Sequence, residues 1–199
     1  MILYFLAVLT VSAESDLDRK IHEAVQPFLK EQVVTGAVTL VAHEGHLIHL
    51  KAHGLSEKEK DRATGVEDLY WIASMTKPII GAAVLILQDR GFIKIDDMVE
   101  THLAEFKDLW LLDEVKDTRR MLKRPSRRIT LKDLLTHTSG VPNTSAPRAH
   151  TTLGEIVAQT SQQPLQFEPG SKWSYSNAGI NILGRVIEIV SGVSLIQFL

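Results

Sequence analysis

The alternation of apolar and polar positions predicts a helix followed by a β-hairpin in the first third of the chain. Ser15, with Asp18 three residues later, is typical of a helix start. Residues 37–42 and 47–52 are two runs rich in strand-forming residues, and they are joined at Glu44-Gly45. The apolar positions that would form one face of the helix are Leu17, Ile21, Val25 and Phe28.

The remainder of the chain is predicted to be largely helical. A polar, charged loop is expected at 58–65. Residues 78–87 are apolar on nearly every face and end before Gly91, which predicts a helix that is buried on all sides. Further helices are predicted at 132–135, 153–160 and 178–190.

The first eleven residues point to export. Residues 2–11 form an apolar run in which Thr10 is the one polar residue, and Val11-Ser12-Ala13 has the small-residue pattern that a signal peptidase accepts. We expect a signal peptide at 1–13, a mature domain at 14–199, and a periplasmic or secreted protein. The apolar run is about half of the roughly 20 residues that a spanning helix needs, so no stable membrane span is expected. Attachment to a membrane through this segment, or a buried N-terminal element, is the alternative.

Composition excludes several classes of protein. The 199 residues include 44% hydrophobic and 23% charged residues, which is typical of one globular domain. The formal net charge of −2 argues against a nucleic-acid-binding protein. There is no cysteine, so disulfides, thiolate nucleophiles and cysteine-ligated metals are excluded. Six cations crowd into 119–128, where we expect an exposed loop.

Four histidines within eleven residues raise the hypothesis of a metal site. They are His43, His46, His49 and His53. On a strand, His49 and His53 share one face while His46 has the opposite parity, so the four cannot converge from a single face. A solvated hairpin is therefore favoured, and we expect no metal.

A Ser-x-x-Lys pair at the start of the apolar helix is the first candidate for catalytic chemistry. Ser74 and Lys77 would share a face, because side chains at i and i+3 on a helix are neighbours. The helix N-terminus favours an alkoxide and disfavours a second positive charge, so Lys77 could accept a proton near neutral pH. About one such pair is expected by chance in this composition. A helix cap beside a surface lysine is the alternative.

A rarer feature, Tyr-x-Asn, follows Pro169-Gly170 and leads into a predicted helix. A phenol at Tyr175 held near a lysine can be driven toward phenolate and can transfer protons. Asn177 can present an amide donor and acceptor to a substrate and to Lys77. The alternative is an interface aromatic at Tyr175 and a helix cap at Asn177.

Four segments in the same order resemble the serine β-lactamase and penicillin-binding protein superfamily. Residues 72–79 (IASMTKPI) resemble its nucleophile motif, and 129–140 (ITLKDLLTHTSG) resemble a second signature. Residues 91–97 resemble the turn after the nucleophile helix, and 167–179 resemble the segment containing Tyr-Ser-Asn. The resemblance covers about 36–199. Tyr-x-Asn is nearer to class C β-lactamases, DD-peptidases and related esterases than to class A enzymes.

The resemblance implies an α+β fold in which an antiparallel sheet flanked by helices adjoins an all-helical region. It implies that Ser74 is the acylated nucleophile, that Lys77 and Tyr175 are the acid/base pair, and that Asn177 orients substrate. The implied substrate is a β-lactam, an ester or a D-Ala-D-Ala-type peptide, and no cofactor is implied. A Ser-His-Asp triad using His137 and Asp133 is disfavoured, because no Gly-x-Ser-x-Gly surrounds any serine.

The family's third motif, Lys-Thr-Gly or His-x-Gly on a late strand, has no counterpart after Asn177. That strand lines the pocket and supplies a second oxyanion donor. We therefore expect this chain to be the N-terminal part of a hydrolase, with an incomplete sheet. The alternative function is a non-catalytic β-lactamase-like binding module. Glu168 is not assigned the deacylation role that a glutamate has in class A enzymes.

Overall fold

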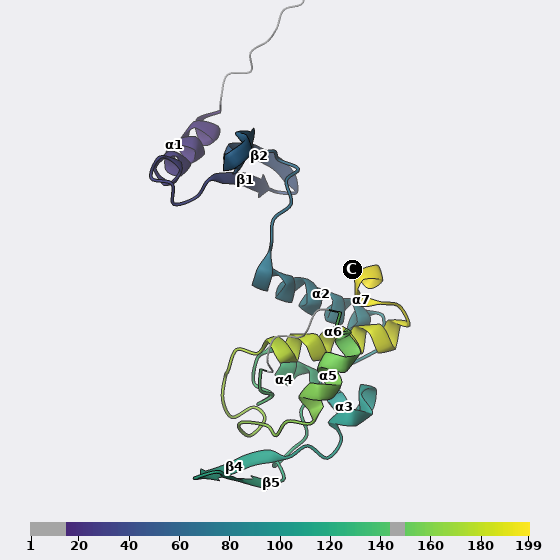
Figure 1. The fold of residues 1–199 in the computed structure, drawn as a ribbon. Coiled ribbons are helices and arrows are strands. Elements are labelled where there is room, and N and C mark those ends of the chain that lie inside the picture. Colours follow the sequence, from purple (N-terminus) through teal and green to yellow (C-terminus); the bar gives the residue numbers. More distant parts are fainter. Residues whose placement is uncertain (1–14, 144–149) are drawn as a thin grey trace, which may run out of the picture. The chain divides into compact units, whose positions relative to one another are not determined.

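The computed structural model describes residues 15–143 and 150–199, and the chain forms two compact units, 1–71 and 72–199. Figure 1 shows helices and small antiparallel sheets, as the α+β prediction requires. The predicted signal peptide lies outside the described residues. Within the described ranges, no helix has the length and apolar character needed to cross a membrane.

The N-terminal unit begins with α1 (Asp16–Lys30), which starts where the sequence predicted. The Ser15 hydroxyl caps it by accepting a hydrogen bond from the Asp18 N–H at 3.1 Å. The predicted apolar face is half-buried except at Phe28, which is exposed. Leu29 is half-buried in its place, because it stands one further helical turn beyond Val25.

The sheet of this unit has the strand order β1-β2-β3. Strands β1 (Gly36–His43) and β2 (His46–Glu57) pair antiparallel around a two-residue turn at Glu44-Gly45. Both turn residues have positive φ, at 49° and 78°, as expected for a tight hairpin, so the predicted hairpin is confirmed. The expected loop at 58–65 instead contains a 3-10 turn (Lys58–Lys60) and the short strand β3 (Arg62–Ala63).

Two of the four hairpin histidines are buried, so the prediction of a fully solvated hairpin is wrong for them. His49 and His53 lie on one face, as their parity predicts, and each ring bonds the Thr39 hydroxyl, at 2.7 and 2.9 Å. Asp18 from α1 bonds the other nitrogen of His49. Helix α1 contacts β2, and this polar network lies between them. Among the described residues, no group of three potential metal ligands converges.

The C-terminal unit is built around helix α6 (Asn177–Ser191), which ends at Gly192 in the left-handed conformation. Its residues Ile182, Leu183, Val186 and Ile187 are fully buried. The helices that contact α6 are α2 (Thr76–Asp89), α3 (Val99–His102), α4 (Leu131–Leu135), α5 (Leu153–Ser161) and α7 (Leu195–Phe198). The predicted helices at 132–135, 153–160 and 178–190 are therefore confirmed.

Helix α2 is buried on one side only, so the prediction of burial on every face is wrong. Its inner side consists of Ile80, Ala83, Val84 and Leu87, and α6 packs in contact with α2. Ile79, Leu85 and Ile86 are exposed on other faces. An apolar pattern predicts that a helix can be buried, but it does not specify which elements cover it.

The cation-rich segment also differs from expectation. Strands β4 (Leu111–Lys116) and β5 (Arg119–Lys123) form an antiparallel hairpin, so the predicted loop is wrong at 119–123. The residues of β5 are all exposed, as predicted. Lys123 pairs with Asp113 at 2.8 Å across the hairpin, which lowers the repulsion that a run of cations would otherwise create.

Candidate active site

Ser74 lies in a 3-10 turn (Ala73–Met75) that leads directly into α2. The preceding Ala73 has φ of 44°, a left-handed conformation that costs a residue with a Cβ about 1–2 kcal/mol. The Met75 N–H donates to the Ile72 carbonyl at 2.9 Å and closes the turn. This geometry holds the Ser74 hydroxyl at an exposed position beside the first turn of the helix.

Lys77 is the second residue of α2, and its ammonium reaches the nucleophile candidate. Its Nζ donates to Ser74 Oγ at 3.1 Å, as the i,i+3 spacing predicts. The side chain is half-buried. Pro78 is the third residue of the helix, where its missing N–H would have no intrahelical partner.

Tyr175 comes from the loop before α6 and completes the cluster from 101 residues away in sequence. Its phenol donates to Ser74 Oγ at 2.6 Å. The Lys77 ammonium lies over the Tyr175 ring, 4.6 Å from its centroid. Hydrogen bonds first with Lys77 and then with Ser74 lower the pKa of the Tyr175 phenol, because both favour the phenolate. Ser74, Lys77 and Tyr175 are thus brought together as predicted.

Asn177 is placed beside this cluster without joining it. It is the first residue of α6 and is exposed. Its backbone N–H donates to Asn143 Oδ1 at 2.7 Å. In the part of the chain that the structure describes, no hydrogen bond joins the Asn177 side-chain amide to Lys77, so that expected contact is not found.

Asn143 is a site residue that sequence reasoning missed. Its Oδ1 accepts from the N–H groups of Asn177 and Ala178, and its Nδ2 donates to the Tyr175 carbonyl at 3.1 Å. One side chain thus satisfies the first two N–H groups of α6 and holds the Tyr175 backbone. The available signal was an asparagine after Pro142, which is typical of turns and gives no information about distant partners.

His137 contacts Tyr175 but does not form a triad with Asp133. Its ring centroid lies 4.9 Å from that of Tyr175 and 6.0 Å from that of Trp173. Burial, and then the charge of Lys77, lower the pKa of His137. The Asp133 carboxylate is instead bonded by Arg127, at 2.6 and 2.8 Å.

Glu168 is bonded to Ser126. Its Oε2 accepts from both the backbone N–H and the hydroxyl of Ser126, each at 2.8 Å. These bonds lower the pKa of the Glu168 carboxyl, the backbone bond first. Glu168 therefore joins two loops of the C-terminal unit.

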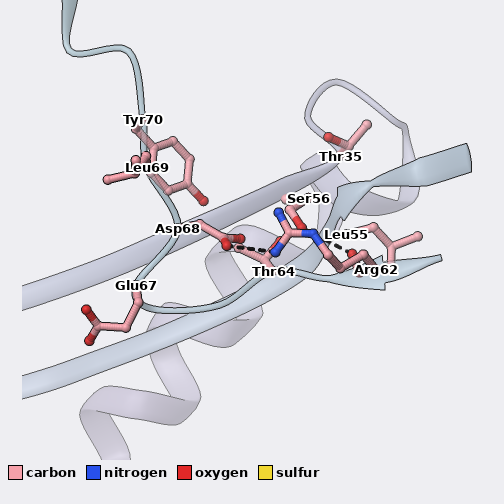
Figure 2. Close-up of a pocket in the computed structure, with 10 residues that line it drawn as sticks. Thr35, Leu55, Ser56, Arg62, Thr64, Glu67, Asp68, Leu69 and Tyr70 are labelled. Atoms are coloured by element: carbon pink, nitrogen blue, oxygen red, sulfur yellow. Dashed lines mark hydrogen bonds and ion pairs between the residues drawn. The ribbon is translucent and has the colours of Figure 1, made fainter. Parts of the chain in front are cut away.

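A separate hollow lies in the N-terminal unit, with a volume of about 480 Å³. Figure 2 shows Arg62 and Asp68 bonded to each other at its edge, at 2.9 Å. Thr64 lines it, and the buried Thr64 hydroxyl has no hydrogen-bond partner among the described residues. None of the four predicted site residues lines this hollow.

The sequence and the fold place the chain among known proteins. The profile of the beta-lactamase family matches residues 21–199, so the chain belongs to the beta-lactamase family. Esterase EstB of Burkholderia gladioli is 33% identical over 183 residues, which are 84% of this chain and 44% of the esterase.

Two solved structures extend this relationship. EstCE1, described as a hydrolase with promiscuous acyltransferase activity, matches with a TM-score of 0.79 and 28% identity, over 92% of this chain and 49% of its own. The octameric penicillin-binding protein homologue from Pyrococcus abyssi matches with a TM-score of 0.74 and 25% identity, over 92% and 41%. The chain spans less than half the length of each of these relatives.

Proposed function

We propose that the chain carries the acyl-transfer centre of a serine hydrolase in which Ser74 is the nucleophile. Lys77 and Tyr175 are the acid/base pair, and Asn177 orients the substrate. The observation that carries the proposal is the convergence of Lys77 Nζ and the Tyr175 hydroxyl on Ser74 Oγ, at 3.1 and 2.6 Å. A nucleophile within hydrogen-bond reach of a base that is itself oriented by a third group is the arrangement that covalent catalysis requires.

In the acylation step, the Tyr175 phenolate takes the proton of the Ser74 hydroxyl. Ser74 Oγ forms a bond to the substrate carbonyl carbon, and the carbonyl electrons move to its oxygen. When the tetrahedral intermediate collapses, the bond to the leaving group breaks and Tyr175 returns the proton to that group. The lowered pKa of Tyr175 supports this role, because it raises the fraction of phenolate near neutral pH.

Deacylation uses the same groups with water as the nucleophile. Tyr175 takes a proton from water, the hydroxide adds to the acyl carbon, and the bond from that carbon to Ser74 Oγ breaks. The proton then returns to Ser74. The Lys77 ammonium lies 4.6 Å from the Tyr175 ring centroid and stabilises the phenolate that exists between these transfers.

The oxyanion would be stabilised by the Ser74 backbone N–H. This N–H lies at the start of a 3-10 turn that continues into α2, where the first N–H groups have no intrahelical acceptor. The partial positive charge of the helix N-terminus acts in the same direction. One such donor is worth about 3–4 kcal/mol of transition-state stabilisation.

Carboxylic esters are the substrate class to test first. The curated relative with 33% identity is named an esterase, and EstCE1 is described as a hydrolase with acyltransferase activity. Met75, which follows Ser74, and Trp173, two residues before Tyr175, are both exposed and offer apolar contact to an acyl chain. β-Lactams and D-Ala-D-Ala-type peptides use the same nucleophilic chemistry and form the comparison set.

Turnover of p-nitrophenyl butyrate by wild type, Ser74→Ala and Ser161→Ala tests the proposal. Ser161 is the matched control, because in the described residues its hydroxyl bonds only the Ala158 carbonyl at the end of α5. We expect Ser74→Ala to lose at least about 10³-fold in kcat and Ser161→Ala to retain it. Undiminished turnover by Ser74→Ala would identify another nucleophile. Binding of a β-lactam without any covalent adduct would favour the binding-module function.

We also propose that the chain is exported through residues 2–11. Their apolar run and the following Val11-Ser12-Ala13 support this. N-terminal sequencing of the protein from a bacterial expression host should find a mature chain beginning near Glu14. A chain that retains residues 1–13 and sediments with membranes would instead support attachment through this segment.

A further inference from the structure

We propose that His137 is a positioning residue that fixes Tyr175 against Ser74 by holding the backbone on both sides of the tyrosine. This inference rests on the proposed function, because it concerns how the acid/base group of that site is held. His137 does not touch the reacting Ser74 hydroxyl in any described contact. Its effect on the reaction would be exerted through Tyr175.

Two hydrogen bonds to His137 flank Tyr175 in the chain. The Ser174 N–H donates to the His137 carbonyl at 2.9 Å. The Ser176 N–H donates to the Nδ1 atom of the His137 ring at 3.3 Å. The residues immediately before and after Tyr175 are thus both held by one residue. The phenol, which extends from the backbone between them, is restricted in position.

The ring of His137 adds a packing surface. It lies against the Tyr175 ring with an interplanar angle of 37°, and Trp173 meets it edge-on at 85°. Tyr175 is 41% exposed and therefore lacks the dense packing that fixes a core aromatic. A side chain with this exposure needs local contacts to stay within hydrogen-bond distance of Ser74.

His137 is itself well anchored. It follows α4 with a φ of 59°, a left-handed conformation in which histidine is enriched over most residues with a Cβ. Its N–H donates to the Leu134 carbonyl, and the next N–H, of Thr138, donates to the Asp133 carbonyl at 2.8 Å. Leu131 and Leu134 of α4 are fully buried. His137 is therefore attached through α4 to the core of the C-terminal unit.

The bond from Ser176 requires a particular form of the imidazole. Nδ1 can accept only when the ring is neutral with its proton on Nε2. The surroundings of the ring favour the neutral form: burial, and then the charge of the Lys77 ammonium from α2, lower the pKa of His137, and Tyr175 and Trp173 pack against the ring. Asp133, on the preceding helix α4, is paired with Arg127.

The first test measures the ionisation of Tyr175 without using activity. The difference between the absorbance titration curves of wild type and Tyr175→Phe isolates the ionisation of this phenol from those of Tyr4 and Tyr70. We expect Tyr175 to titrate below its ordinary value near 10 in wild type, because the contacts with Lys77 and Ser74 are intact. His137→Phe retains an aromatic ring but removes the acceptor, and it should shift the Tyr175 titration back toward 10.

His137→Asn is the matched variant. Its side-chain oxygen offers an acceptor close to the position of Nδ1, and asparagine tolerates the left-handed backbone. The pKa of Tyr175 should stay lowered in this variant, and kcat for p-nitrophenyl butyrate should stay within about threefold of wild type. His137→Phe should lose about tenfold or more in kcat with KM nearly unchanged. The proposal is overturned if both variants shift the pKa of Tyr175, or if neither variant shifts it.

A second measurement uses wild type alone and so does not depend on whether a variant folds. Long-range ¹H–¹⁵N correlation spectra report the tautomer of His137, and we expect the neutral form with its proton on Nε2 at pH 7.5. A proton on Nδ1 would exclude the Ser176 bond and overturn the inference. Both the titration and the tautomer are read without turnover. If the positioning holds while Ser74 is never acylated, only the proposed function fails.

Discussion

The chemistry proposed for Ser74 comes from its neighbours, and these neighbours differ in how far sequence could predict them. The contact of Lys77 with Ser74 was predictable, because side chains three residues apart on a helix lie on one face. The rare Tyr-x-Asn pattern made Tyr175 a candidate, but its pairing with Ser74 came from family resemblance, because local pattern does not encode a contact across 101 residues. Asn143 was missed for the same reason, since its partners are in the loop before α6.

The contribution of Tyr175 can be measured by removing one oxygen atom. Tyr175→Phe keeps the ring beneath Lys77 but removes the hydroxyl that bonds Ser74. We expect kcat for ester hydrolysis to fall by about 10²–10⁴-fold with little change in KM, because acid/base catalysis is lost while binding is retained. Tyr70→Phe, in the N-terminal unit, is the control. Equal activity of both variants would assign the proton transfer to Lys77.

At the level of elements, capping and periodicity predicted most helices, while charge and tertiary context produced the errors. Helices α1, α4, α5 and α6 begin and end within a few residues of their predicted limits. Strand β5 was missed because six cations indicated a loop, although pairing with β4 supplies Asp113 opposite Lys123. His49 was expected in solvent, because a hairpin pattern cannot show that α1 will cover one face.

The ion pair that anchors α4 gives an element-level prediction. Asp133 is buried, caps α4 through Thr130, and is bonded twice by Arg127. Asp133→Asn should lower the free energy of unfolding at pH 7 by about 2 kcal/mol, because hydrogen bonds to a charged partner are weakened. Urea unfolding measures this, and Asp16→Asn in the exposed first turn of α1 is the control.

The effect of Asp133 should depend on pH in one direction. Burial raises the pKa of this carboxyl, but the bonds with Arg127 and Thr130 outweigh burial and hold the pKa below 3.8. A lowered folded-state pKa stabilises the protein above the unfolded value and loses that stabilisation as pH falls through the folded value. The difference in free energy of unfolding between wild type and Asp133→Asn should therefore be largest at pH 6 and shrink below about pH 4. A difference that is constant from pH 7 to pH 2.5 would contradict this.

For the whole molecule, the sequence predicted an α+β member of the β-lactamase superfamily, and the family match and the fold confirm it. The mature domain at 14–199 stays a prediction, and within the chain two compact units meet in sequence at Trp71 and Ile72. The division was not visible in composition, because the segment around it is neither rich in glycine and proline nor of low complexity.

Limited proteolysis tests this division. Leu69 and Trp71 are almost fully exposed and Tyr70 is half-exposed, so three chymotrypsin sites lie together before the C-terminal unit. We expect the first cuts of the intact chain to fall at 69–71 and to leave a resistant fragment of about 72–199. Mass spectrometry identifies the fragments. First cuts within α6, whose apolar residues are buried, would contradict the division.

The most direct test of the account is to find where an acyl group is attached. Wild type and Ser74→Ala would be mixed with a p-nitrophenyl ester and, separately, with a fluorescent penicillin, quenched in acid, and analysed by intact mass and peptide mapping. The account predicts one added acyl group on Ser74 in wild type and none in the variant. An adduct on another residue, or no adduct in a cooperatively folded chain with either reagent, would contradict the claim that Ser74 is an acyl-accepting nucleophile.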